Sequence, residues 1–422
     1  MRLQPSTWSA VLPFLIACGG AASHAAPADA GLIVIAPVDA SHDVAPKDTG
    51  RDAPFDPAAC VSADASTALP CGTLAFDVSP VASRARNHHV TLIADTLSGP
   101  MLYAIGGAES EAAIAFVDRI PINADGSLGA WVSEPPLPTG TGGLVGDLVS
   151  GVIVVAGGTT ASGTTDAAYS AVVETDGSLG PWKPAGSVGE GRMHAGSFSI
   201  GSTMWILGGF DNQSVWSDIV SATVSPDGTV STWGAAGQLP GPRSHFSLTL
   251  LGSYVYITGG LSASAYNDPP DLADAWRGQV ESDGTVDQWT QLTTLPVAEA
   301  THASFFYGGY LHVCGGINNV PAQDDRCWRA PVLADHTLGT WEDVSPLPLA
   351  RGHVHQMPIL GDKVYSIAGA IDFNLDSTTQ IDIGVFSTSP SKMSIAPRAP
   401  RPVVHPSPPR HGSMCHLASH AS

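Results

Sequence analysis

The chain has 422 residues and a formal charge of −20, with 46 glycines, 34 prolines and only 13% charged residues. This acidity argues against a nucleic-acid partner, because binding to phosphates depends on clustered lysines and arginines. No stretch shows sustained helical periodicity with capping residues, so the composition indicates an all-β protein of many short strands and turns.

The first 18 residues have the features of an export signal. Arg2 supplies a positive charge, and the apolar run over residues 11–17 is too short to span a bilayer. The end of this run resembles the bacterial lipobox, in which a cysteine becomes the lipidated first residue. Cys18 is therefore the predicted lipidation site, and the lipid is the only expected contact with a membrane, at the outer membrane or cell surface. Plain secretion or a periplasmic location, after cleavage near Ala25, is the alternative.

Two segments are expected to stay outside any folded domain. Residues 19–70 are rich in Ala, Pro, Asp and Ser, and residues 389–422 are rich in Pro. Such segments bury too little apolar surface to offset the entropy lost on ordering. We interpret the first as a flexible tether and the second as a disordered tail, which leaves residues 71–388 as one folded domain.

The domain is built from a repeat, which two markers show independently. Glycine pairs recur at intervals of 51, 51, 51, 56 and 53 residues, the sixth being degenerate: Gly106-Gly107, Gly157-Gly158, Gly208-Gly209, Gly259-Gly260, Gly315-Gly316 and Ala368-Gly369. Tryptophans keep step with them: Trp131, Trp182, Trp233, Trp289 and Trp341. An Asp-Gly pair precedes four of these tryptophans and predicts a hairpin whose two central residues both have positive φ. We assign the tryptophans and glycine pairs to structure.

A period of about 50 residues with four strand-sized runs is typical of a propeller blade. The sequence here resembles the kelch repeat, through the opening at residues 242–245, the apolar run into Gly259-Gly260, and Trp289 after its Asp-Gly hairpin. The resemblance covers about residues 72–388 in six copies and implies an all-β, six-bladed β-propeller. It specifies the fold more than the function, because one scaffold hosts many tasks.

The spacing of the repeats predicts how the ring closes. Phe76 precedes Arg86 by the same 10 residues that separate Trp233 from Arg243, so residues 74–78 match a tryptophan-bearing strand. The last copy ends at residues 381–387 and no tryptophan follows it. The N-terminal strand is therefore predicted to complete the last blade, which leaves no open sheet edge at the seam.

Six cysteines fit an oxidising compartment. Cys314 and Cys327 lie on successive strand candidates of one blade and are predicted to form a disulfide, with free buried thiols as the alternative. Cys60 and Cys71 are predicted to close a small loop where the tether meets the propeller. No cysteine and histidine set completes a zinc site, and we expect no metal or other cofactor.

The candidate binding residues open each repeat, where an arginine is followed two places later by a histidine. These residues are Arg86 and His88, Arg192 and His194, Arg243 and His245, Arg351 and His353, with Ala300 and His302 in the fifth copy and Thr141 and Gly143 in the second. Strand alternation would place each arginine and its histidine on the same face. The kelch resemblance implies that this face approaches one mouth of the central channel, where a positive ring would hold a carboxylate or sulfate. The alternative is that these residues only tie neighbouring blades together.

The functional prediction is an exported, lipid-anchored, monomeric binding or scaffold module whose ligand is a protein or an anionic glycan of the cell envelope. The alternative is a carbohydrate-active enzyme similar to the kelch propellers that equilibrate the anomers of sialic acid, with a mouth histidine or Glu299 as acid or base. A copper oxidase of the galactose oxidase type is a further alternative, but its Tyr, His and Cys set is not matched. We assign no catalytic residue.

Overall fold

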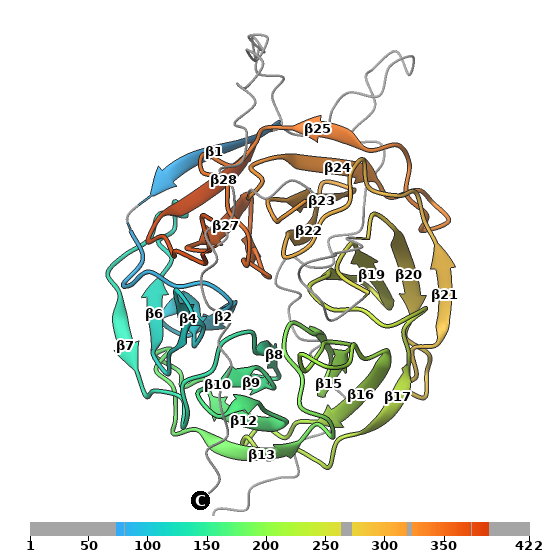
Figure 1. The fold of residues 1–422 in the computed structure, drawn as a ribbon. Helices are drawn as coiled ribbons and strands as arrows, with labels where there is room; N and C mark the ends of the chain where they lie inside the picture. Colours follow the sequence, from blue (N-terminus) through green and yellow to red (C-terminus); the bar gives the residue numbers. More distant parts are fainter. Residues whose placement is uncertain (1–72, 80, 263–271, 319–322, 373, 388–422) are drawn as a thin grey trace, which may run out of the picture. The chain divides into compact units, whose positions relative to one another are not determined.

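The computed structural model describes residues 73–79, 81–262, 272–318, 323–372 and 374–387. Their regular secondary structure is entirely β, and six four-stranded antiparallel sheets are arranged around a central axis (Figure 1). The described residues include no helix with the length and hydrophobicity that a membrane crossing requires. The predicted six-bladed propeller is confirmed. The predicted signal, lipidation site Cys18, tether and tail, with Cys60 and Cys71, lie outside the described residues.

Each blade is a four-stranded meander numbered from the axis outward. The first contains β2 (Val90–Thr96), β3 (Gly99–Ile105), β6 (Val117–Pro121) and β7 (Val132–Glu134); the second contains β8 (Val145–Val149), β9 (Val152–Ala156), β12 (Ala167–Val172) and β13 (Lys183–Ser187). The third contains β14 (Gly196–Ile200), β15 (Thr203–Leu207), β16 (Asp218–Thr223) and β17 (Gly234–Gln238); the fourth contains β18 (Ser247–Leu251), β19 (Tyr254–Thr258), β20 (Ala275–Gln279) and β21 (Gln288–Gln291). The fifth contains β22 (Ala303–Tyr307), β23 (Tyr310–Cys314), β24 (Cys327–Pro331) and β25 (Glu342–Val344). The short hairpins β4–β5 (Ala108–Glu109, Ala112–Ala113) and β10–β11 (Thr159–Thr160, Gly163–Thr164) extend two of the loops between second and third strands.

The sixth blade joins the two ends of the repeat region. It contains β26 (Ile359–Leu360), β27 (Lys363–Ile367) and β28 (Ile381–Ser387), and its outer strand is β1 (Thr73–Ser79). β1 pairs antiparallel with β28 over seven residues, and the two strands lie side by side in blue and red in Figure 1. The predicted closure is confirmed, and it removes the free edge that an unpaired β28 would expose.

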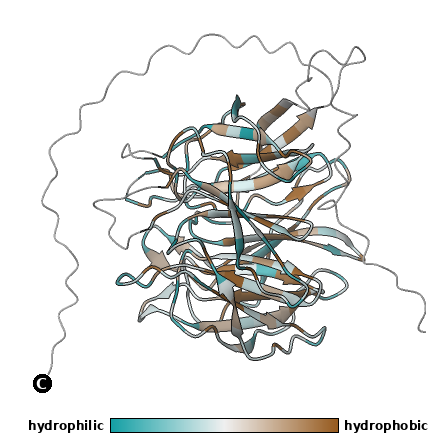
Figure 2. Ribbon diagram, turned by 90° about the vertical axis from the view of Figure 1, so that its right-hand side faces the viewer, coloured by the Kyte–Doolittle hydropathy of each residue, from teal (hydrophilic) through white to brown (hydrophobic). Residues whose placement is uncertain are grey.

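The core lies between adjacent blades because each sheet is covered on both faces. Every residue of β9 is buried, and its Val152 and Val154 belong to one apolar cluster with Met204 and Ile206 of the next blade. In Figure 2 brown, apolar residues run along the strands of the propeller. A half-exposed strand would alternate apolar and polar residues. A strand that is covered on both faces is instead apolar at every position, as β9 is.

The Asp-Gly hairpins differ from the expected turn. Gly126 has φ of 81°, but Asp125 is not among the residues with positive φ. The N–H of Gly126 bonds to the carbonyl of Asn123, and Asp125 Oδ1 accepts hydrogen bonds from both the N–H and the hydroxyl of Ser127. The prediction of two central residues with positive φ was therefore wrong: the aspartate side chain closes the turn, and only the glycine needs the left-handed conformation.

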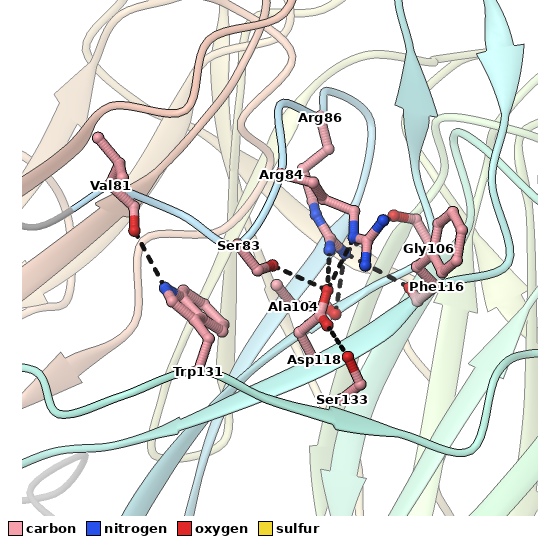
Figure 3. A network of polar contacts seen from close by, with 10 residues as sticks. All are labelled: Val81, Ser83, Arg84, Arg86, Ala104, Gly106, Phe116, Asp118, Trp131 and Ser133. Carbon is pink, nitrogen blue, oxygen red and sulfur yellow. Dashed lines mark hydrogen bonds and ion pairs between the residues drawn. The ribbon is translucent and has the colours of Figure 1, made fainter.

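The recurring tryptophans link neighbouring blades. The indole N–H of Trp233 donates to the carbonyl of Ala185 at 3.0 Å, and that of Trp341 to the carbonyl of Thr293 at 3.1 Å, in each case on the outer strand of the preceding blade or just after it. At the seam Trp131 reaches the carbonyl of Val81, which follows β1 (Figure 3). The tryptophan contact between neighbouring blades is therefore also present between the sixth and first blades, where the propeller closes.

Cys314 and Cys327 form the predicted disulfide. They are directly opposite in the register of β23 and β24, with Cα atoms 4.1 Å apart, and both side chains are buried. The disulfide joins the ends of two strands where the loop between them begins.

Candidate functional site

Six residues around the axis form a closed ring of backbone hydrogen bonds, which we call the axial ring. Each N–H donates to the carbonyl of the member in the preceding blade at 2.7–3.0 Å, and the first closes on the last. The members are His88, Gly143, His194, His245, Thr301 and His353. All six have φ between 51° and 66°. One residue from every blade is thus held in a left-handed conformation that an L side chain adopts only when the surroundings enforce it.

The axial ring corrects the register of the fifth blade. Thr301, not His302, occupies the position equivalent to the other histidines, and Glu299, not Ala300, occupies the arginine position. The Glu299 carbonyl accepts from Gly260 N–H at 2.7 Å, as the Arg243 carbonyl accepts from Gly209 N–H. The prediction was wrong because this repeat is longer than the others. Aligning His302 with the histidines of the other repeats shifted the predicted opening of the fifth repeat by one residue. His302 instead bonds through Nε2 to the hydroxyl of Thr258, in the preceding blade, at 2.8 Å.

The four opening arginines do not face a ligand site. Arg86, Arg192, Arg243 and Arg351 are 0–3% exposed, and each binds an aspartate of the third strand of its own blade or the residue before it. Figure 3 shows the first of these networks, in which Arg86 and Arg84 converge on Asp118, and Ser83 and Ser133 donate to the same carboxylate. The Arg86 guanidinium also donates to the carbonyls of Ala104 and Gly106. Each arginine therefore ties the entry of the first strand to the rest of its blade.

Two physical effects explain why the arginine and histidine sets separate. The inner strands begin only after the histidines, at Val90, Gly196 and Ser247 for example, and the histidines themselves have positive φ. Strand alternation does not hold across such residues, so an arginine at position i and a histidine at i+2 do not share a face. The expected common face was therefore wrong: the guanidinium groups lie inside the blades and the imidazoles at the axis.

The acidic partners of the arginines come from two different registers. In the third and fourth blades, Asp218 and Asp274 directly precede the residue that pairs with the last residue of the second strand. In the first and sixth blades, Asp118 and Asp382 directly follow that residue, so they lie two positions further along the chain. The fifth blade exchanges the charges, with Glu299 at the arginine position and Arg326 on the third-strand side, 3.7 Å apart.

Burial and the partner charges act in opposite directions in these pairs. Burial would raise the pKa of Asp118 and of Asp274, but hydrogen bonds and the charge of the arginines outweigh it and the pKa is lowered, whereas burial prevails at Arg86 and Asp382. Burial lowers the pKa of Arg86 to about 10 despite the neighbouring Asp118 carboxylate. Burial also raises the pKa of Asp382, and the guanidinium of Arg351 offsets this only in part. The pairs are accordingly desolvated structural ties, whose charge is not available to an external anion.

The imidazoles of the axial ring meet at the axis together with one that the sequence analysis did not select, His355. We call His88, His194, His245, His353 and His355 the axial histidine cluster. Ring centroids lie 3.9 Å apart for His88 and His353, 4.0 Å for His194 and His245, and 4.6 Å for His88 and His194. Nδ1 of His194 lies 3.4 Å from Nε2 of His355.

The cluster is uncharged at neutral pH. Burial lowers the pKa of His88, His194 and His245 well below 6.5, and the neighbouring imidazoles lower it further. Burial lowers the pKa of His353 to about 3 and that of His355 to about 4. Neutral imidazoles can each donate one hydrogen bond and accept one. The part of the chain that the structure describes contains no group of three or more His, Cys, Asp or Glu arranged to hold a metal ion.

Gln356 is the other axial residue that the sequence analysis missed. Its Oε1 accepts from the N–H of Thr91 at 2.9 Å and its Nε2 donates to the carbonyl of Gly146 at 3.0 Å, so one side chain of the sixth blade bonds to the first and second blades. A cavity of about 50 Å³ lies beside it, lined among others by His89, His194 and His355. The signal in the sequence was the extra histidine at i+2 of His353, followed by Pro358, which interrupts the inner strand.

Comparisons with known proteins agree with this architecture. No family model matches the chain. Kelch-like protein 36 of Bos taurus is 26% identical over 209 residues, which are 39% of this chain and 33% of that protein. Beta-scruin of Limulus polyphemus is 25% identical over 205 residues, covering 45% of this chain and 20% of that protein. The chain thus matches a third or less of the length of these relatives.

A solved structure of YjhT superimposes with a TM-score of 0.58 at 11% identity, covering 72% of this chain and 95% of that one. At this identity the match supports the fold alone. Together with the similarity to kelch-repeat proteins and the six closed four-stranded blades, it shows that the chain is a kelch-repeat β-propeller.

Proposed function

We propose that the protein is an exported binding module, anchored by a lipid at Cys18, which binds a protein partner through the face of the propeller that carries the loops between second and third strands. The observation that carries this proposal is the closed axis. The axial ring joins all six blades, and Gln356 bridges three of them across the axis. Recognition of a partner would therefore depend on the loops, as in many proteins with a rigid scaffold.

The strand order defines this loop face. β2 begins and β3 ends at the same end of the first sheet, where the β4–β5 hairpin emerges, and the chain also passes from blade to blade at this end. The turns between first and second strands, and the Asp-Gly turns, lie at the opposite end. Exposed acidic residues of the loop face include Glu109, Glu111, Glu190 and Asp376.

The charge distribution favours a partner with basic residues over an anionic glycan. The four opening arginines are buried against carboxylates, so the positive mouth expected from the sequence has no free guanidinium to offer. The exposed acids of the loop face would attract lysines and arginines of a partner and steer its association.

An enzymatic role at the axis has less support. A cavity of about 50 Å³ has room only for water-sized molecules, whereas ligand sites for small molecules are typically about 300 Å³ or more. A sugar ring does not fit beside the axial histidine cluster in this conformation.

Export and anchoring are supported by the N-terminal sequence and by the buried disulfide of the fifth blade. A structural disulfide is typical of an oxidising compartment. The Cys18→Ser variant tests the anchor: we expect the wild-type protein to fractionate with membranes and to incorporate labelled fatty acid, and the variant to do neither.

The binding proposal is tested with the full chain by cross-linking in intact cells. In the variant Glu109→Lys/Glu111→Lys we expect loss of the cross-linked partner. The matched control Asp95→Lys/Glu174→Lys makes the same charge change at exposed residues of the opposite face and should retain it. Equal loss in both variants would contradict the loop-face proposal, and capture of an anionic glycan by both would favour the glycan alternative.

A further inference from the structure

The sixth blade departs from the others where its chain enters the axis. The inner strands of the first five blades contain five to seven residues, whereas β26 contains only two. The residues before it, Val354–Pro358, have no regular secondary structure although His353 still belongs to the axial ring. We call Val354–Pro358 the axial segment.

The axial segment is held mainly by side chains. Within the described residues, no backbone N–H of residues 354–357 donates to another backbone group, and the carbonyl of Pro358 accepts from Tyr365. The remaining polar contacts are those of Gln356 with Thr91 and Gly146, and the contact between His355 and His194. A segment without ladder hydrogen bonds can open at a smaller free-energy cost than the paired strands behind it.

The groups around His355 make this contact sensitive to protons. Imidazoles face it from the first, third, fourth and fifth blades and from its own: His88, His89, His194, His245, His302 and His353. The charged groups that act on this set are two guanidinium groups, Arg86 on His89 and Arg243 on His302. Both oppose a further positive charge, as does each imidazole once it is protonated.

The hydrogen bond between His194 and His355 needs one nitrogen with a proton and one without. When both rings are protonated, the two facing nitrogens are both donors and both carry positive charge, so the contact becomes repulsive. His355 is only partly buried and is next to a cavity, so its ring has a short route to solvent. Release of this ring would leave the axial segment held by the hydrogen bonds of Gln356 and by the buried side chains of Val354 and Met357, which pack in one apolar cluster with Phe305 and Val364.

We propose that the axial segment is an acid-released plug: protonation of the histidines at the axis frees Val354–Pro358 and opens the centre of the propeller while the outer strands stay paired. The pairing of β27 with β28, and of β28 with β1, does not involve the axial segment and would keep the ring closed. The device is independent of the proposed partner, since it depends only on contacts within the chain.

Hydrogen exchange measured by mass spectrometry on the full chain tests the proposal, at pH 7 and pH 5.5 and corrected for the intrinsic rate. The readout is the Thr91 amide, whose N–H donates to Gln356 Oε1 in the closed segment. With a histidine pKa of about 4 in the closed segment and ~6.5 when released, we expect the protection of this amide to fall about eightfold at pH 5.5. Protection in β19 and β27 should fall only as far as the unfolding free energy, measured by urea at the same two pH values, falls.

Variants separate this mechanism from general acid destabilisation. His355→Gln keeps a hydrogen-bonding side chain without the charge and should remove the pH dependence of exchange at the Thr91 amide. His336→Gln is the matched control, because His336 lies on an Asp-containing turn away from the axis, and it should behave as the wild type. Gln356→Ala removes the acceptor of the Thr91 amide and should raise its exchange already at pH 7. Loss of protection throughout the propeller at once, or an unchanged pH response in His355→Gln, would overturn the proposal.

Discussion

The backbone N–H of His88 donates a hydrogen bond to the carbonyl of His353 at 3.0 Å. One residue opens the first repeat and the other opens the last, so this bond completes the axial ring in the same way that β1 and β28 complete the sixth sheet at the rim. The propeller is therefore closed twice, at its centre and at its periphery. Local changes at blade entries should consequently affect the stability of the whole molecule.

Replacing Arg86 with methionine should destabilise the protein by about 3 kcal/mol, because Asp118 would lose its fully buried guanidinium partner and keep only Arg84, Ser83 and Ser133. Urea unfolding followed by circular dichroism measures the effect. Arg277→Met is the control, since Arg277 is only half-buried and makes surface contacts, and it should cost less than about 1 kcal/mol. Similar stability of both variants would show that Arg86 is not a structural tie.

The exchanged charges of the fifth blade predict a rescue. Glu299→Arg and Arg326→Asp should each destabilise the protein, since each places like charges together around the same site. The double variant restores opposite charges in the arrangement of the other blades, and we expect it to be more stable than the sum of the single effects by about 1 kcal/mol. A double-mutant cycle of unfolding free energies measures this coupling. Strict additivity would refute the pairing of these two side chains.

Stability should fall on acidification below pH 6.5. Burial lowers the pKa of His302, His312 and His353 to about 3 and that of His355 to about 4. Between these values and the unfolded-state pKa of ~6.5, the unfolded chain binds protons that the folded protein does not. This contribution is fully present above pH 6.5 and is lost progressively toward pH 4, by about 1.4 kcal/mol per pH unit for each histidine.

Urea unfolding at pH 7, 6 and 5 checks this dependence. His312 lies outside the axial histidine cluster, in a stack with Phe305, so His312→Phe should reduce the slope against pH by the share of one histidine. If His312→Phe showed the wild-type slope, the buried histidines would not be the cause of acid sensitivity.

Gly259 should be irreplaceable for a reason beyond its backbone angle, although Ala368 occupies the equivalent position of the sixth repeat with φ of 53°. Gly259 and Gly252 have almost the same φ, 57° and 60°, but a Cβ at Gly259 would lie 2.2 Å from the carbonyl oxygen of Glu299, whereas a Cβ at Gly252 would meet nothing within 4 Å. Gly252→Ala should cost about 1 kcal/mol, from the left-handed conformation alone. Gly259→Ala should cost several kcal/mol more or prevent folding, because it pushes two blades apart. Equal melting temperatures would contradict this account.

The sequence alone determined the number of blades, the closure by the N-terminal strand and the disulfide of the fifth blade. These features follow from spacing: a repeat of constant length places equivalent residues at equivalent points, and Cys314 and Cys327 fall on neighbouring strands of one unit. Closure was readable because residues 74–78 keep the spacing of a tryptophan-bearing strand with respect to Arg86.

Tertiary structure decided where the opening residues point and what they contact. The partners of the arginines lie 26 to 32 positions away and in two registers, so no fixed offset in the sequence reveals them. Positive φ at the histidines breaks strand alternation and sends arginine and imidazole in different directions. The position of Glu299, and the insertion of His355 and Gln356 at the axis, depend on which atoms of six separate blades meet at one point. Residue spacing along the chain does not reveal these contacts at the axis, because they form only when the six blades pack together.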